Sequence, residues 1–493
     1  MESLIAQINF QTIYSEIIIT IFAILVLMLQ ALFPHKSKNL FGYLSLIGTL
    51  LAGAVLFLNS PVFNSGAVEY SFSGMWIVDN YSKFFKLIFL LCTVLTILIS
   101  IKYVKDEGIN YGEYFTLILF ATLGMMIMAS GGDFVTIFLG LELMSICLYV
   151  LAGFNRGRCI SNEAALKYFL LGSFATGFLL YGIALFYGAT GSTNLKTIAQ
   201  FTVSGDFHNN TILIGTILLL IGFAFKIAAV PFHMWTPDVY QGSPTPITAF
   251  MSAGPKAAAF AALVRVFMDS LPSIRNEWTD LIWILAVLTM TVGNLIALAQ
   301  DNVKRMLAYS SIAHAGYILV AFIAADKIGL SSILFYLLAY TFMNLGAFAI
   351  ITVVGGKGEE KVNVEDFTGF GYRNPIAAIM MSLFLFSLAG IPPTAGFMGK
   401  FYIFTAAIKE GFLGLAIIGV INSVISVYYY LRITIVMYMK GSDDPTAGEK
   451  FPAIVFSPAV IIAIIIAAYG VLRMGILPTD YIEIAHQSLI AFK

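Results

Sequence analysis

Four charged side chains lie inside long apolar stretches of the sequence. They are Glu142, Lys226, Lys256 and Lys400. An ionised side chain at the centre of a membrane helix costs roughly 2.5–3.5 kcal/mol on insertion scales. Burial also disfavours the charged form of a carboxyl or amino group, so such groups can gain and lose protons near neutral pH. The four residues therefore predict a proton relay, and the alternative is a static set of ion pairs that fixes helix packing.

Two histidines and a further lysine extend this set. His314 lies in an apolar stretch, and His233 follows Pro231. Histidine titrates near neutral pH and suits a relay, although a histidine in apolar sequence is more often a buried structural residue. For Lys167, about one turn inside its apolar stretch, a relay role and a side chain that reaches the membrane surface are both open. No cysteine or carboxylate lies at ligand spacing from either histidine, so no metal site is expected.

The stretches that carry these residues belong to a membrane protein. Hydrophobic residues make up 59% of the 493 residues and charged residues 11%, and the mean hydropathy is +0.90. Ordinary soluble domains have about 45–50% and about 25%. The composition excludes a soluble enzyme, a nucleic-acid-binding protein and a disordered chain. Lys and Arg number 27, as do Asp and Glu, so no net charge attracts polyanions.

Fourteen apolar runs reach the length of roughly 20 residues that a helix needs to cross a bilayer. We therefore predict an all-α, polytopic membrane protein with about fourteen transmembrane helices. The runs are 12–33, 39–58, 81–101, 113–130, 133–153, 163–188, 211–230, 246–268, 279–299, 306–324, 330–354, 375–408, 414–438 and 453–472.

Basic residues in the loops predict the orientation, because cytoplasmic loops carry an excess of Lys and Arg. The odd-numbered loops hold 13 basic residues: Lys36, Lys38, Lys102, Lys105, Arg156, Arg158, Lys304, Arg305, Lys357, Lys361, Arg373, Lys440 and Lys450. The even-numbered loops and both tails hold 6, which are Lys196, Arg275, Lys327, Lys409, Arg473 and Lys493. We therefore expect the odd loops in the cytoplasm and both termini outside.

Two of the fourteen spans are interrupted by proline. The seventh meets Pro231, and the twelfth contains Pro392 and Pro393 after Gly390. A broken helix at membrane depth is tolerated only where protein or a wet cavity satisfies the freed backbone groups. If spans 4–8 and 9–13 are two five-helix repeats, each break falls in the fourth helix. Because five is odd, the repeats are inverted, an arrangement typical of transporter sites near the membrane midplane. Two unrelated proline kinks are the alternative.

These features divide the chain into four predicted parts. The first three helices occupy 1–110, the first repeat 111–272, the second repeat 273–440, and the last helix with its tail 441–493.

The sequence contains none of the motifs that hold nucleotides, haem or zinc. It has no glycine-rich phosphate loop, no paired metal-binding histidines and no haem attachment motif, and its three cysteines lack the spacing of a metal or iron–sulfur site. We expect no cofactor in this chain. Lys83, Lys86, Arg265 and Arg432 lie near predicted helix ends, where we expect them to extend to the membrane surface.

Several motifs together resemble the antiporter-like membrane subunits of respiratory complex I. They are GLEL (140–143), KIAAVPFHMWTPDVYQGSPTP (226–246), SAGPK (252–256), DNVKRMLAYSSIAH (301–314) and GIPPTAGF (390–397). These matches extend over most of 110–440. The wider family also includes subunits of multi-component cation/proton antiporters and membrane hydrogenases.

Within this family the chain is similar to the branch termed subunit N of bacterial NADH–quinone oxidoreductase. Lys400 stands where subunit M typically has glutamate, and only about 20 residues follow the last span, which leaves no room for the lateral helix of subunit L. The matching plastid subunit is also similar, so an organelle source is the alternative. The resemblance implies a multi-pass protein of the bacterial inner membrane.

The resemblance also implies partners and residue roles. NADH, FMN, iron–sulfur clusters and quinone would belong to partner subunits, and this chain would be a non-redox part of the enzyme. Its partners would be the homologous pump subunits, small membrane subunits, membrane lipids and, indirectly, the peripheral redox arm. Glu142 and Lys226 would form a pair that opens and closes, Lys256 and His314 would carry protons, and Lys400 would release them outward. His233 would orient water near Lys226.

Three functions stay open at this point. The first is a proton-translocating subunit driven by quinone reduction in other subunits. The second is a subunit of a self-standing cation/proton antiporter or membrane hydrogenase. The third is a scaffold that transports nothing and only anchors its neighbours.

Overall fold

The computed structural model describes residues 9–33, 39–58, 68–203, 210–359, 361–439 and 455–489. Within them, thirteen helices are long and apolar enough to cross a membrane. They are α2 (Tyr14–Leu32), α3 (Asn39–Leu58), α4 (Asn80–Asp106), α5 (Gly112–Ser130), α6 (Phe134–Ala152), α7 (Cys159–Thr190), α9 (Asn210–Ile227), α11 (Thr245–Ser270), α12 (Arg275–Leu298), α13 (Val303–Ala324), α14 (Lys327–Gly355), α18 (Leu413–Met439) and α20 (Pro458–Ile476).

The remaining elements are short. They are α8 (Leu195–Val203), α10 (Trp235–Gly242), α15 (Phe370–Arg373), α16 (Pro375–Ala389), α17 (Ala395–Lys409), α21 (Pro478–Gln487) and several 3₁₀ turns. Strands β1 (Glu69–Ser71) and β2 (Trp76–Val78) pair antiparallel in a small hairpin. The sequence did not predict this hairpin, because three residues per strand are too few to establish an alternating pattern.

All fourteen predicted spans are present, and the predicted fold class is confirmed. Thirteen of them correspond to one helix each, and the twelfth span consists of α16 and α17 in succession. Neither half alone has the length of a spanning helix, since each has 15 residues. The seventh span is shorter than predicted, because α9 ends at Ile227 rather than at residue 230.

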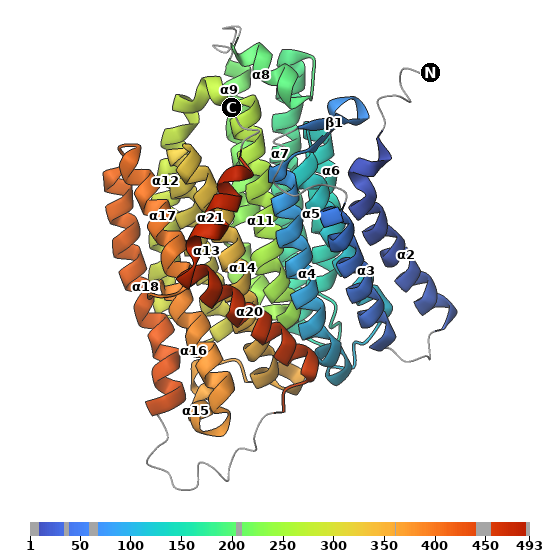
Figure 1. The fold of residues 1–493 in the computed structure, drawn as a ribbon, viewed down its shortest axis with the longest axis vertical. Helices are drawn as coiled ribbons and strands as arrows, with labels where there is room; N and C mark the ends of the chain where they lie inside the picture. The colour runs from blue at the N-terminus through green and yellow to red at the C-terminus, as the bar shows by residue number, and fades with distance from the viewer. Residues whose placement is uncertain are drawn as a thin grey trace.

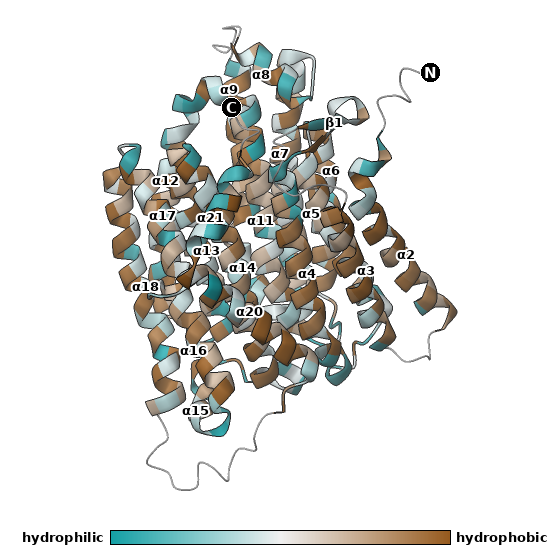
Figure 2. Ribbon diagram, in the orientation of Figure 1, coloured by the Kyte–Doolittle hydropathy of each residue, from teal (hydrophilic) through white to brown (hydrophobic). Residues whose placement is uncertain are grey.

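Helices α4, α11, α13 and α14 form the interior of the bundle, and every residue in the most apolar window of α11 is buried. The outer helices include α2 and α3 at one edge of the view and α18 at the other (Figure 1). Helix α20 crosses obliquely over α4 and α14 (Figure 1). Apolar residues dominate the spans, whereas hydrophilic residues gather at the two ends of the bundle (Figure 2).

Both interrupted spans break in the same way. Helix α9 ends before Ala228, which has φ 60°, and a cis bond precedes Pro231. Helix α16 ends before Gly390, which has φ 86°, and a cis bond precedes Pro393. The residue after each helix thus has a left-handed backbone conformation, which ends the helix and turns the chain away from the helix axis. The breaks fall at matching positions of the two predicted five-helix units.

The two units begin on opposite faces. Helix α5 follows Glu107, whose carboxylate accepts a hydrogen bond from the Gly358 amide beyond the end of α14 (2.6 Å). Helix α12 begins at Arg275, which donates to the carbonyls of Ile323 and Ala324 at the end of α13 (3.1 and 2.9 Å). Helices α13 and α14 run in opposite directions, so these ends lie on opposite faces. This placement agrees with inverted units.

Residues of the odd loops meet on one face, which we call the basic-loop face. Its described basic residues are Lys102, Lys105, Arg156, Arg158, Lys304, Arg305, Lys357, Lys361 and Arg373. Contacts such as Asn155–Glu107 (3.3 Å) and Arg158–Glu359 (3.0 Å) join different odd loops. Lys36, Lys38, Lys440, Lys450, Lys493 and both chain ends lie outside the described residues. The side of the membrane that this face occupies stays a prediction.

Two residues expected at the membrane surface are instead buried in ion pairs. Lys86 pairs with Glu16 of α2 (2.7 Å), and its side chain is only 2% exposed. Arg265 pairs with Asp79 (2.9 Å), the residue that caps α4. The expectation was wrong because helix position alone does not tell whether a lateral neighbour covers the side chain. Lys83 is likewise buried, whereas Arg432 reaches an exposed pair with Asp301 near the helix end, as expected.

Candidate functional site

Lys226 is positioned by a stripe of polar residues along α6. Glu142, Ser145 and Tyr149 are three and four residues apart and therefore share one face of this helix. The Lys226 ammonium donates to the Ser145 hydroxyl (2.8 Å) and lies 3.4 Å from the Tyr149 hydroxyl. Glu142 accepts a hydrogen bond from Thr176 of α7 (2.9 Å) instead. Among the described residues no ion pair joins Glu142 to Lys226, so closure of this pair stays a prediction.

The position of Lys226 at the end of α9 also favours its charge. It is the last residue but one of the helix. Carbonyl groups without helical partners give a helix C-terminus a partial negative charge, which attracts cations. The proline break thus creates a local environment for an ammonium group in the interior of the bundle.

Lys256 lies on the wholly buried helix α11 and reaches α13. Its ammonium donates to the backbone carbonyl of Ser311 (2.7 Å) and to the Ser311 hydroxyl. Pro255 precedes it inside the helix and has no amide hydrogen, so the hydrogen-bond ladder of α11 is interrupted at that point.

His314 lies between two tyrosines from other helices. Its Nδ1 atom is 2.6 Å from the hydroxyl of Tyr336 on α14, and its Nε2 atom is 3.0 Å from that of Tyr430 on α18. Tyr430 also contacts Ser310, the neighbour of the serine that binds Lys256. A neutral imidazole has one donor and one acceptor nitrogen, so the ring can pass a proton from one tyrosine side to the other.

Lys400 closes the set at the second break. Its ammonium donates to the carbonyls of Leu388 and Ala389 (3.1 and 3.0 Å), the last residues of α16, and to the hydroxyl of Ser423 (2.9 Å). It also lies 4.9 Å from the ring centre of Tyr317, which is one turn from His314 on α13. The end of one half-helix therefore holds the charge carried by the other half-helix.

The structure separates Lys167 and His233 from these buried residues. Lys167 is 41% exposed and pairs with Asp238 and with Glu163 (both 2.7 Å). His233 lies half-buried in the first break, and its buried Nδ1 atom has no hydrogen-bond partner among the described residues. No hydrogen bond connects it to Lys226 within that part of the chain. The predicted roles of both residues remain untested.

Sequence reasoning missed the hydroxyl groups that connect the charges. Helical spacing could have found some of them, since Ser310, His314 and Tyr317 share a face of α13, and Tyr336 and Tyr340 share a face of α14. Such spacing does not reveal which face meets which neighbour. Ser145, Tyr149, Ser423 and Tyr430 were missed for the same reason.

Comparisons with known proteins give the chain its family. The family model described as "NADH:quinone oxidoreductase/Mrp antiporter, TM" matches residues 131–426. A protein of Trichlorobacter lovleyi named NADH-quinone oxidoreductase subunit N is 53% identical, and the alignment covers 99% of this chain and 98% of that protein. The chain belongs to the NADH-quinone oxidoreductase subunit N family.

Solved structures support membership in this family. A chain of respiratory complex I from Thermus thermophilus with bound aureothin has a TM-score of 0.79 and 35% identity, with 95% of this chain and 98% of that chain covered. A chain of an archaeal membrane-bound sulfane sulfur reductase, described as a respiratory membrane complex, has a TM-score of 0.86 and 27% identity, with 98% of each chain covered. The fold of this chain thus also occurs in a respiratory membrane complex that has a different name.

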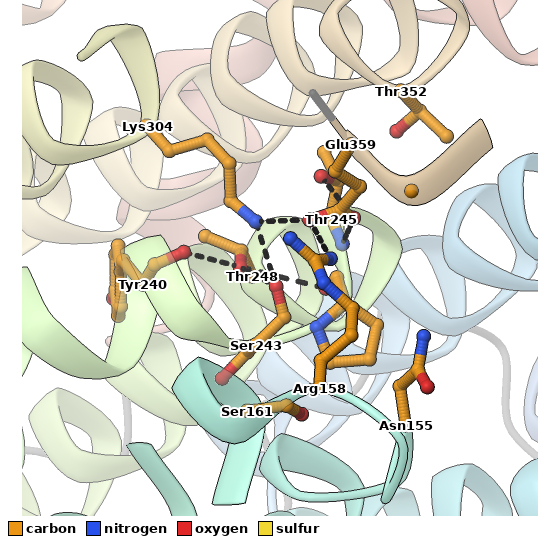
Figure 3. Close-up of polar contacts among 12 residues, drawn as sticks. Asn155, Arg158, Ser161, Tyr240, Ser243, Thr245, Thr248, Lys304, Thr352 and Glu359 are labelled. Carbon is orange, nitrogen blue, oxygen red and sulfur yellow. Dashed lines mark hydrogen bonds and ion pairs between the residues drawn. The ribbon is translucent and has the colours of Figure 1, made fainter. Parts of the chain in front are cut away.

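In this subunit N family member, the basic-loop face holds its charges differently from the interior. Glu359 follows α14, and its carboxylate accepts hydrogen bonds from the amide and hydroxyl of Thr245 at the start of α11 (both 2.6 Å) (Figure 3). Lys304 and Arg158 pair with its other oxygen (2.9 and 3.0 Å) (Figure 3). Lys304 was counted as a loop residue from the sequence, but its side chain is only 1% exposed.

This arrangement fixes the charge of Glu359. Burial alone would raise the pKa of a carboxyl group, but Lys304 and the hydrogen bonds from Thr245 lower the pKa of Glu359 to about 2. Glu359 therefore stays ionised at neutral pH, where it pins the loop after α14 onto the first turn of α11. By contrast, no carboxylate forms an ion pair with Lys226, Lys256 or Lys400 among the described residues.

Proposed function

We propose that this chain is a proton-translocating subunit in the membrane arm of NADH–quinone oxidoreductase. The observation that carries the proposal is a buried series of ammonium, imidazole and hydroxyl groups, in which the three lysines bind neutral oxygen atoms. Such groups can exchange protons without leaving an opposite charge unpaired in the membrane interior. Family membership supports the assignment, since the relatives at up to 53% identity carry the name of a subunit of this enzyme.

In this proposal protons move from the basic-loop face to the opposite face. Lys226 takes up a proton while the Glu142 pair is open, and Lys256 and His314 transfer protons toward Lys400. Quinone reduction in partner subunits supplies the energy. NADH, FMN, iron–sulfur clusters and quinone belong to those subunits. The basic-loop face is cytoplasmic, because it carries the excess of basic residues.

The test compares Lys226→Ala with Lys327→Ala, which removes an exposed lysine from the end of the bundle. Both variants are introduced into the complete complex, and proton uptake by inside-out vesicles is measured beside NADH–quinone reductase activity. We expect Lys226→Ala to lower the protons pumped per NADH in an assembled complex, and Lys327→Ala to behave as wild type. Full pumping in assembled Lys226→Ala complex would refute the proposal.

A second candidate function is a subunit of a cation/proton antiporter, because the matching family model covers both groups of proteins. A native gel after mild detergent extraction separates the two. Migration of the chain in a large band with NADH dehydrogenase activity supports the first function. Migration in a smaller band without flavin, together with sodium-dependent proton exchange, would support the antiporter.

A further inference from the structure

A cavity on the basic-loop face leads toward Lys226. Its volume is about 810 Å³, and it lies between the α4–α5 turn, the last turns of α6 and the start of α7. Its lining includes Ile109, Tyr111, Phe154, Arg156 and Ala165. Arg156 and Tyr111 are exposed, so the rim of the cavity meets solvent at this face.

Tyr149 belongs both to this cavity and to the Lys226 site. The residue lines the cavity, is 7% exposed, and has its hydroxyl 3.4 Å from the Lys226 ammonium. Its ring packs edge-on against Tyr168 (4.7 Å between ring centres). Tyr149 therefore contacts both the cavity and the buried lysine.

The neighbouring helix leaves space for this hydroxyl. Gly172 of α7 is buried beside Tyr149, and a Cβ atom at Gly172 would stand only 2.2 Å from the Tyr149 oxygen. Any other residue at 172 would displace the hydroxyl from its place next to Lys226. The close approach of α7 and the two contacts of Lys226 thus define one position for the phenol group.

We propose that the cavity is the aqueous vestibule from which Lys226 takes up protons, and that Tyr149 is the relay residue at its inner end. The proposal rests on the proton-translocating function proposed above. As the neutral amine of Lys226 takes the hydroxyl proton of Tyr149, the phenol oxygen takes a proton from hydronium in the vestibule. Tyr149 then again carries one proton, Lys226 carries one more, and a water molecule remains. Ser145 holds the ammonium in line with this transfer.

The first test removes the hydroxyl with Tyr149→Phe and uses Tyr168→Phe as the matched control. Tyr168 is the neighbouring buried tyrosine, and among the described residues its hydroxyl forms no hydrogen bond with a lysine. In the assembled complex we expect Tyr149→Phe to lower proton pumping by roughly a hundredfold, the lower end of the range for loss of a positioned proton-transfer group. Tyr168→Phe should keep the wild-type rate. Equal pumping by the two variants would overturn the role of Tyr149.

The second test blocks the vestibule with a label that can be removed again. A reversible loss of pumping would not be expected if these residues had only a structural role. Ala165→Cys is made in a Cys159→Ser background, because Cys159 is the exposed cysteine of the described chain. A charged, membrane-impermeant methanethiosulfonate is added on the basic-loop face, and dithiothreitol then removes it. We expect pumping to fall several-fold on labelling and to recover on reduction. Glu365→Cys in the same background is the control, because Glu365 is exposed on the same face and does not line the cavity, and its labelling should leave pumping unaffected.

The outcomes separate this inference from the function on which it rests. If Lys226→Ala stops pumping but labelled Ala165→Cys and Tyr149→Phe both pump normally, the vestibule is wrong and the function stands. If Lys226→Ala pumps normally, the function itself fails. A deficit in Lys226→Ala, Tyr149→Phe and reversibly labelled Ala165→Cys supports both.

Discussion

Replacing Glu359 by glutamine tests whether the basic-loop face is held together by a fixed charge. Glutamine keeps the size of the side chain and its capacity to accept hydrogen bonds. It removes the negative charge that faces Lys304 at 2.9 Å, in a place where both side chains are nearly inaccessible to solvent. We therefore expect the loop after α14 to detach more often from the start of α11.

Two routes give a similar size for this effect. The pKa of Glu359 is about 2 instead of the usual 4.5. One pKa unit corresponds to about 1.4 kcal/mol, so this difference amounts to about 3 kcal/mol. Independently, removing one partner of a buried ion pair costs about 3–5 kcal/mol, because the other charge is left unpaired. Local opening should therefore increase roughly a hundredfold in the variant.

Hydrogen exchange of the Thr245 amide measures this opening directly, since that amide donates to Glu359. The complex is labelled in deuterated buffer at neutral pH and at a series of lower pH values, and peptides that span the start of α11 are analysed by mass spectrometry. Because the folded pKa lies below the unfolded one, the contribution of Glu359 is complete above about pH 4.5 and declines as the pH falls toward about 2. Wild type should lose protection in that range, and the glutamine variant should not.

Glu365→Gln is the matched control, because Glu365 is an exposed carboxylate a few residues further along the same connection. It should leave exchange at Thr245 within about twofold of wild type, as expected for a surface substitution. Equal exchange at Thr245 in the Glu359→Gln variant and in wild type would refute the reasoning. It would mean that the ion pairs contribute no net stability to this face.

Two further substitutions test how the helices are held. Lys86→Met leaves Glu16 buried and unpaired, so it should destabilise the subunit by about 3–5 kcal/mol, seen as faster heat inactivation of NADH–quinone reductase activity. Adding Glu16→Gln to it should restore most of the lost stability, and no restoration would contradict the ion-pair explanation. Gly396→Ala places a Cβ 1.8 Å from the Ser387 carbonyl oxygen at the second break, so it should cost about 1–3 kcal/mol and lower the amount of subunit in purified complex. Gly414→Ala, which meets open space on α18, should not, and equal losses in both would argue against a packing effect.

The membrane spans and the breaks could be predicted because their signals are local. Apolar length alone predicts a spanning helix, since no water is present to satisfy a backbone that is not helical. Proline marks both breaks for a similarly local reason, because it lacks an amide hydrogen. The end of the seventh span was misjudged by about three residues, since 228–230 is apolar although it is no longer helical.

The partners of the buried charges could not be predicted in the same way. Lys86 and Arg265 pair with carboxylates on other elements, and Arg265 and Asp79 are 186 positions apart in the sequence. Hydropathy along one helix contains no information on which neighbour covers a given face. The same holds for His314, whose two tyrosines come from α14 and α18, two helices that sequence spacing cannot bring together.

The lysines of the interior bind neutral oxygen atoms, whereas several lysines and arginines at the ends of the bundle pair with carboxylates. Lys256 and Lys400 contact backbone carbonyls and serine hydroxyls, which are dipoles without net charge. A carbonyl oxygen that loses an ammonium partner loses one hydrogen bond, whereas a buried carboxylate that loses it becomes a solitary ion. Full and empty proton carriers can therefore occupy nearly the same scaffold. A protein built in this way can repeat its cycle without dismantling the helix packing that surrounds each carrier.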